Sequence, residues 1–133
     1  MVLGRDGGAL PLLWPLFQMG FGGTVGSGSQ WISWIHVDDA ARMAAWLLTS
    51  PDLDGVYNAT APHPTRMREF TRTLADALRR PHLTHVPGAA LRLVLGRRAT
   101  LVLDGQRVLP TRALDLGFPF AFPTLHEAFR NFL

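Results

Sequence analysis

The pattern of hydrophobic and polar positions predicts an α/β chain in which short strands alternate with amphipathic helices. Residues 30–37 alternate loosely and are rich in tryptophan and isoleucine, which favours a strand. A helix is expected between this strand and Pro51, because apolar residues there recur at spacings of three and four. Its expected buried face consists of Ala40, Met43, Ala44, Leu47 and Leu48.

Asp38 is predicted to begin that helix. An aspartate at the N-cap accepts backbone N–H bonds and interacts favourably with the positive end of the helix dipole. Asp38 and Arg42 are also spaced for an i,i+4 ion pair. We therefore predict that Asp38 caps the helix and pairs with Arg42.

The middle of the chain continues the alternation. The segments "VYNAT" (56–60) and "LTHVP" (83–87) are predicted strands on either side of a helix that follows Pro64. That helix is expected to end at the basic pair 79–80, which suits the negative end of the helix dipole. Its buried stripe is predicted to be Met67, Phe70, Leu74, Ala77 and Leu78.

The last third is predicted to be helical. Short helices are expected at 89–95, 99–104 and 111–116, each followed by a glycine; for the last one this is Gly117. Thr124 and Glu127 have the spacing of a capping box, in which each side chain satisfies the other residue's amide. The core face of this final helix is predicted to be Leu125, Ala128, Phe129 and Leu133.

The N-terminal segment is less regular. Residues 10–17 are apolar but contain Pro11 and Pro15, which favours a loop or a short helical segment leading into the glycine-rich residues 20–28. No internal repeat or linker is visible. We therefore predict one α/β domain over residues 1–133.

Composition excludes several classes of function. The 133 residues are 47% hydrophobic and contain no cysteine, which excludes disulfides and thiolate chemistry. All 13 basic residues are arginine, so no Schiff-base or phosphate-loop lysine exists. The arginines are scattered and the net charge is only +3, which argues against a nucleic-acid partner. Apolar runs are too short to cross a membrane, and no secretion signal is visible, so a cytoplasmic location is predicted.

The segment "GSGSQWISWIHVDD" (26–39) concentrates the candidate chemistry. Its glycines do not have the G-x-G-x-x-G spacing of a dinucleotide site and are interpreted as turn-forming. Ser33, His36 and Asp38 are the residue types of a hydrolytic triad, but alternation along a strand separates Ser33 from His36. A metal site could use His36 with Asp38 and Asp39, or His82 with His85; a helix cap and a short strand explain these residues more simply.

Several segments together resemble one family. "VLGRDGGAL", "GSGSQWISWIHVDDAARM", "GVYNATAPHPTRMREF", "GQRVLPTRALDLGF" and "FPTLHEAFRNFL" occur in the order found in the C-terminal portion of the epimerase-like branch of the extended short-chain dehydrogenases/reductases. The resemblance spans essentially the whole chain. It implies the last strand–helix units of a Rossmann fold with a small substrate-side α/β domain, whereas the N-terminal dinucleotide-binding part is absent.

The resemblance implies NAD(P)H for an intact family protein and no cofactor bound by this chain alone. The family's catalytic tyrosine is followed four residues later by a lysine; here the single tyrosine, Tyr57, is followed by Ala61. The chain by itself therefore cannot assemble that proton donor. In the family, a G-x-G-x-Q loop with a following arginine receives the nucleotide-sugar diphosphate; Gly26, Gly28 and Gln30 match it, but Ile32 replaces the arginine.

Gln30, Gly28, Trp31 and Trp14 are the predicted substrate-binding residues, and no catalytic residue is assigned. Trp31 and Trp34 have an alternative interpretation as core residues, and Trp14 as a residue that packs against the missing N-terminal domain. Our leading hypothesis is a substrate-binding C-terminal segment that is catalytically incomplete on its own. The competing hypothesis is a stand-alone binding or protein-interaction domain. Both predict exposed apolar surface, which would contact a missing N-terminal domain or another copy of the chain.

Overall fold

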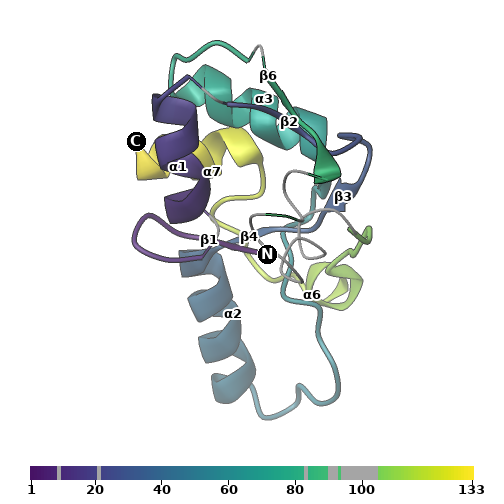
Figure 1. Ribbon diagram of the computed structural model, residues 1–133. Coiled ribbons are helices and arrows are strands. Elements are labelled where there is room, and N and C mark those ends of the chain that lie inside the picture. The colour runs from purple at the N-terminus through teal and green to yellow at the C-terminus, as the bar shows by residue number, and fades with distance from the viewer. Residues whose placement is uncertain (9, 21, 83, 90–92, 94–104) are drawn as a thin grey trace.

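The computed structural model describes residues 1–133 except 9, 21, 83, 90–92 and 94–104. It has a mixed α/β architecture, as the sequence predicts (Figure 1). The described residues form three small two-stranded sheets and several helices. The helices predicted at 89–95 and 99–104 lie mainly outside the described residues. Within the part of the chain that is described, every helix is too short or too polar to cross a membrane.

The first sheet is a parallel pair. Strand β1 (Val2–Leu3) pairs with β4 (Ile35–His36), and helix α2 (Val37–Thr49) follows β4 directly and packs against both strands. A sheet of two short strands is marginal by itself, so the packing of α2 on both strands stabilises the pair. Figure 1 shows α2 extending away from the helices at the opposite end of the molecule.

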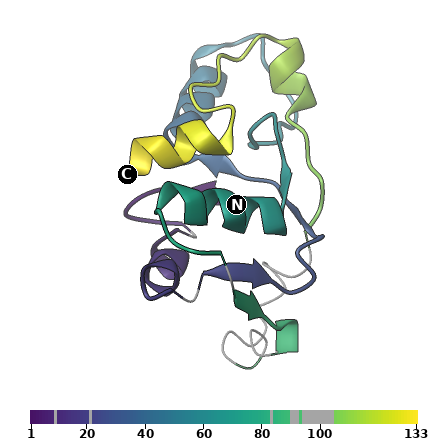
Figure 2. The same cartoon turned by 90° about the horizontal axis from the view of Figure 1, so that it is seen from above.

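The other two sheets lie around the remaining helices. Strand β2 (Gly23–Val25) pairs in parallel with β6 (Thr84–Val86), and β3 (Trp31–Ile32) pairs antiparallel with β5 (Thr65–Arg66). Helix α3 (Met67–Ala77) packs on β2 and beside α7 (Leu125–Phe132), as Figure 2 shows from above. Helix α1 (Leu10–Gln18) covers another side, and the short α6 (Thr111–Asp115) lies near α2.

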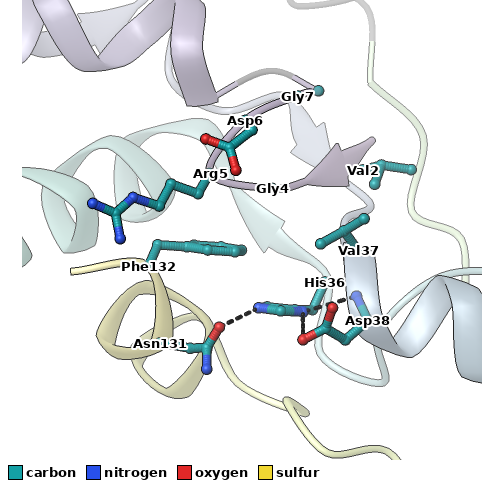
Figure 3. Close-up of a pocket in the computed structure, with 11 residues that line it drawn as sticks. Val2, Gly4, Arg5, Asp6, Gly7, His36, Val37, Asp38, Asn131 and Phe132 are labelled. Atoms are coloured by element: carbon teal, nitrogen blue, oxygen red, sulfur yellow. Dashed lines mark hydrogen bonds and ion pairs between the residues drawn. The ribbon is translucent and has the colours of Figure 1, made fainter.

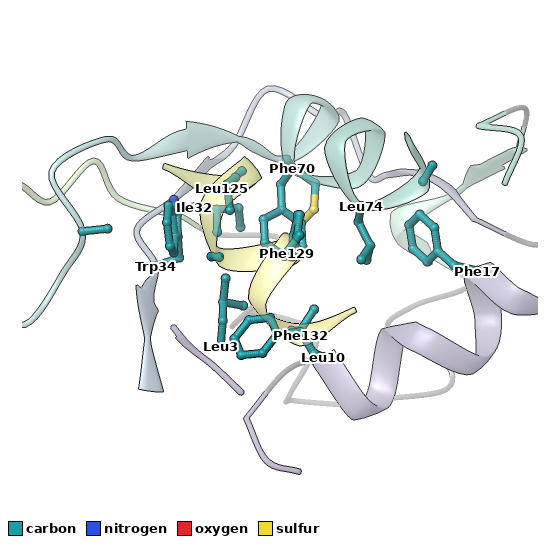
Figure 4. Close-up of a cluster of buried hydrophobic side chains, with 14 of the residues drawn as sticks. Leu3, Leu10, Phe17, Ile32, Trp34, Phe70, Leu74, Leu125, Phe129 and Phe132 are labelled. Atoms are coloured by element: carbon teal, nitrogen blue, oxygen red, sulfur yellow. The ribbon is translucent and has the colours of Figure 1, made fainter. Parts of the chain in front are cut away.

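The main hydrophobic core lies between α1, α3, α7 and the strands next to them (Figure 4). Phe70 of α3 and Phe129 of α7 meet edge to face, with ring centres 5.5 Å apart, and both are fully buried. Pairs of this geometry add to the stabilisation that burial alone provides. A second, smaller cluster joins α2 to α6 through Ile35, Met43, Ala113 and Phe118.

Several sequence predictions are confirmed. The helix after Pro64 buries Met67, Phe70 and Leu74, with Ala77 and Leu78 half-buried against the core. The strand in "LTHVP" is β6, and Gly117 ends α6 with a positive φ of 74°. Thr124 and Glu127 form the predicted capping box at the start of α7.

Other predictions are wrong or incomplete. Residues 30–37 form two short strands rather than one, interrupted at Ser33 and Trp34. The segment "VYNAT" is not a strand: instead of a backbone ladder, the Asn58 side-chain amide donates to the carbonyl of Leu109 at 3.1 Å. In α7, Phe132 occupies the core position that was predicted for Leu133, and Leu133 is exposed. Phe132 completes the i, i+3, i+4, i+7 stripe that begins at Leu125.

The predicted start of α2 is also wrong. Its N-cap is His36, whose Nδ1 accepts from the Asp38 N–H at 3.1 Å, so Asp38 lies in the first turn with its side chain exposed. Arg42 pairs with Asp39 at 3.0 Å rather than with Asp38. Asp39 is fully buried beside Met43, whereas Ala44 and Leu48 of the predicted buried face are exposed.

Candidate functional site

The candidate site is a cavity of about 470 Å³ at the carboxyl ends of β1 and β4 (Figure 3). Ligands of open α/β sheets bind in this position, beyond the carboxyl ends of parallel strands. The chain turns here after Leu3 and after His36, so both connections line the same space. Its walls are formed by the loop 4–8, the start of α2 and the end of α7, including Arg5, Asp6, His36, Asn131 and Phe132.

His36 is held rigidly at this cavity. Its ring is stacked between Phe122 and Phe132, with centroid distances of 3.8 and 4.5 Å, and the residue is 1% exposed. Because Nδ1 accepts from the Asp38 amide, the ring proton lies on Nε2, which donates to Asn131 Oδ1 at 3.2 Å. Both ring nitrogens are therefore engaged, and His36 joins α2 to α7 rather than offering a free base.

Arg5 and Asp6 are exposed charged residues that line the cavity together with Asp38, and the sequence pattern did not predict the first two. They also line a second cavity of about 290 Å³, together with Pro11, Trp14 and Pro15 of α1. The loop 4–8 thus separates two adjoining spaces, and the predicted residue Trp14 belongs to the second. The available signal was position: both charged residues directly follow the first strand, where α/β ligand sites occur.

The loop 26–30 carries the predicted residues Gly28 and Gln30. Gly28 has φ 69°, and a Cβ there would lie 2.5 Å from the Thr24 side chain, so glycine is required. The Gln30 side chain is directed into its own loop: Nε2 donates to the Val25 carbonyl at 3.0 Å, and Oε1 accepts from the Ser27 hydroxyl at 3.2 Å. In this structure Gln30 therefore shapes the loop.

The same loop cannot hold a dinucleotide pyrophosphate. That site requires a glycine-rich turn from a strand into a helix, whose N-terminal amides bind the phosphates. Here the loop connects β2 to β3, a strand to a strand. The residues of loop 26–30 therefore do not fit the pyrophosphate of NAD(P)H.

The two tryptophans of the segment have different environments. Trp34 is fully buried in the core and donates through Nε1 to the His63 carbonyl at 3.1 Å, as its core interpretation predicts. Trp31 is half-buried on β3 and faces Arg66 across the sheet. Its neighbour Ile32, at the position of the family's arginine, is buried in the core.

Other candidate chemistry is not assembled. Ser33 Oγ donates to the Gln106 carbonyl at 2.7 Å and accepts from the Val108 N–H at 2.9 Å, so it is engaged apart from His36. Among the described residues, no three histidine or carboxylate side chains are grouped to hold a metal ion. The Tyr57 ring lies under Arg112, and its hydroxyl is buried without a hydrogen-bond partner.

Comparison with known proteins confirms the family resemblance. Residues 86–132 match the profile of a domain of unknown function, DUF1731. The chain is 50% identical over 130 residues to the epimerase family protein SDR39U1 homolog, chloroplastic, of Arabidopsis thaliana, covering 98% of this chain and 38% of that protein. It is 41% identical over 133 residues to epimerase family protein SAR0825 of Staphylococcus aureus (strain MRSA252), covering 100% and 44%.

Solved structures agree with these matches. The crystal structure of human epimerase family protein SDR39U1 (isoform 2) with NADPH has a TM-score of 0.94 and 39% identity, covering 98% of this chain and 45% of that one. A nucleoside-diphosphate sugar epimerase from Corynebacterium glutamicum has a TM-score of 0.70 and 28% identity, covering 96% and 23%. The chain spans less than half the length of these relatives and matches their C-terminal part.

Proposed function

We propose that this chain forms the substrate-side portion of an NAD(P)-dependent epimerase-like protein, because it is the counterpart of the C-terminal part of epimerase family proteins. The observation that carries the proposal is the similarity to the NADPH-bound human relative over 98% of this chain. Cofactor binding is assigned to protein outside these residues. The chain itself contributes the cavities beside loop 4–8 and the loop 26–30.

The exposed face of α2 supports this division. Four apolar residues spaced as one helical stripe face solvent: Val37, Ala41, Ala44 and Leu48. Leu48 is 87% exposed and Val37 is 42% exposed. The helix also packs on a parallel sheet, which has two strands in the described residues. A helix that is apolar on two faces is normally buried on both. We infer that a dinucleotide-binding domain, supplying further strands and helices, covers this stripe.

The proposed substrate is a small molecule. Its proposed contacts are the Gln30 and Gly28 loop and Trp14, which lines the cavity next to Arg5 and Asp6. The predicted cytoplasmic location stays part of this proposal.

The α2 stripe also fits the alternative hypothesis of a stand-alone interaction domain, because a second copy or another protein would bury the same four residues. The DNA upstream of the Met1 codon separates the two. An in-frame sequence encoding G-x-x-G-x-x-G and Y-x-x-x-K supports the proposed function, whereas a stop codon immediately upstream contradicts it.

A binding measurement gives the second test. The protein expressed from the extended reading frame should bind NADPH, followed by fluorescence, and the 133-residue chain alone should not. Leu48→Arg should weaken NADPH binding by the extended protein by disturbing the covered face of α2. Arg72→Glu, a larger change of charge at an exposed position of α3, should leave it unchanged. Equal NADPH binding by the short chain would overturn the proposal.

A further inference from the structure

Trp31 and two arginines form a cluster on the outer face of the β3–β5 sheet. Trp31 and Arg66 are directly opposite each other in the antiparallel register, so their side chains share one face of the sheet. The opposite face carries Ile32 and Thr65, both buried. The Arg66 guanidinium carbon lies 3.8 Å from the centre of the Trp31 ring, and that of Arg107 lies 5.2 Å from it.

This cluster carries positive charge, and no carboxylate of the described residues forms an ion pair with it. The arginine ion pairs of the described residues join Arg42 to Asp39 and Arg112 to Asp54. Neither Arg66 nor Arg107 takes part in them. The indole face attracts each guanidinium, but two cations at one ring repel each other. An anion between or beside them would remove that repulsion.

Neighbouring contacts hold the guanidinium of Arg66 and the backbone on both sides of Arg107. The Nη1 group of Arg66 donates to the backbone carbonyl of Ser29. Arg107 lies between two residues that are tied to Ser33, whose hydroxyl donates to the Gln106 carbonyl at 2.7 Å and accepts from the Val108 N–H at 2.9 Å. Preorganised guanidinium groups lose less freedom when they bind a ligand.

A cavity of about 270 Å³ adjoins the cluster and is lined by Trp31, Ser33, Gln106 and Val108, among others. The Trp31 indole and the Val108 side chain form an apolar wall of this cavity, and the Gln106 side chain is exposed at its edge. A ligand whose charged group contacts the arginines would have room here for an uncharged portion.

We propose that Trp31, Arg66 and Arg107 form a binding site for a small phosphate- or carboxylate-bearing ligand. Guanidinium groups donate two parallel N–H bonds to either anion, which gives both affinity and orientation. This site goes beyond the proposed function, because its three residues line neither cavity beside loop 4–8 and lie on the face of β3 opposite the core.

Calorimetric titration of the 133-residue chain with inorganic phosphate, pyrophosphate and citrate tests the proposal and separates phosphate from carboxylate ligands. At least one probe should bind saturably and shift the Trp31 indole N–H signal in NMR spectra, assigned with Trp31→Phe. Arg107→Gln should weaken binding about tenfold or more, because it removes a charge-assisted contact. Arg72→Gln removes the same charge from an exposed position of α3 and should have no effect.

Two further samples complete the test. Arg107→Lys keeps the charge but loses the planar fork, so it should bind more weakly than the wild type even if Arg107→Gln fails to fold. The Met1 amino group donates to the Ser33 carbonyl at 2.6 Å beside the same cavity, so binding should also survive N-terminal acetylation. Absence of saturable binding, loss on acetylation, or equal weakening by Arg72→Gln overturns the proposal. Preference for a short oligonucleotide over pyrophosphate also overturns it.

Discussion

The carboxylate of Asp39 in α2 binds the backbone of Phe122, with the Phe122 N–H donating to Oδ2 at 2.9 Å. The other oxygen, Oδ1, accepts from the Ala121 N–H at 2.9 Å and from Arg42 Nη1 at 3.0 Å. Asp39 is completely buried, so these donors replace its hydration. One side chain thus fixes the segment before α7 against α2, and Phe122 in turn stacks on His36 at the candidate cavity.

The first prediction concerns this carboxylate. Asp39→Asn should lower the free energy of unfolding by about 2–3 kcal/mol, because the amide NH₂ would face a backbone N–H in place of an acceptor. Asp38→Asn is the matched control: its side chain is 62% exposed, and only a helix-dipole contribution of about 0.3–1 kcal/mol is at stake. Urea unfolding of both variants measures the difference. Equal costs at the two positions would contradict a structural role for Asp39.

The second prediction concerns a buried hydroxyl without a partner. Thr65 Oγ1 on β5 makes no hydrogen bond, although the residue is 5% exposed. Thr65→Val keeps the shape and removes the unsatisfied group, so it should raise stability by about 1 kcal/mol. Thr71→Val should lower stability by about 1 kcal/mol, since Thr71 Oγ1 bonds the Met67 carbonyl at 3.0 Å and His82 Nε2 at 3.0 Å. Chemical denaturation of both variants measures these changes in stability. A loss of stability in Thr65→Val would show that the Thr65 hydroxyl of the wild type is hydrogen-bonded in solution.

Local signals explain which elements the sequence predicted. The capping box of Thr124 and Glu127 and the stop at Gly117 depend on residues within four positions of each other. Asp39 was missed because its backbone partners lie 82 and 83 positions away, and two adjacent aspartates at a helix start look equivalent in sequence. Only tertiary packing places Asp39 inward and Asp38 outward.

The candidate site shows the same limit. Gly28 and Gln30 were found because a glycine-rich loop is visible in sequence, yet the structure uses the Gln30 amide within that loop. Arg5 and Asn131 line one cavity although 126 positions separate them along the chain, which no local pattern reveals. The pairing of Trp31 with Arg66 likewise depends on strand register.

The third prediction concerns the end of α3. Arg79 has φ 53°, the left-handed conformation that ends a helix, with the Arg80 N–H donating to the Ala75 carbonyl at 2.9 Å. Arg79→Gly should raise stability by about 0.5–1 kcal/mol, since glycine adopts this conformation without strain.

Arg79→Ala removes the charge but keeps the strain, so it should give little of this gain. Gly117→Ala, at the corresponding position after α6, should cost about 1 kcal/mol. Similar gains in thermal unfolding for Arg79→Ala and Arg79→Gly would assign the effect to charge instead.

The last prediction concerns the pH dependence of α7. The hydrogen bond from the Thr124 hydroxyl lowers the pKa of Glu127 below its usual value of 4.5, and the bond from the Thr124 N–H lowers it further. A carboxyl whose pKa is lower in the folded state stabilises the fold above the unfolded pKa, and this stability is lost as the pH falls through the folded pKa. Stability should therefore decline from about pH 4.5 downward in the wild type.

Thr124→Ala removes the hydroxyl of the capping box, so it should cost about 1 kcal/mol at neutral pH and flatten this decline. Thr49→Ala, an exposed threonine in the last turn of α2, should keep the wild-type slope. Urea midpoints measured between about pH 3 and 7 test this, and an unchanged slope in Thr124→Ala would exclude the capping box as its source.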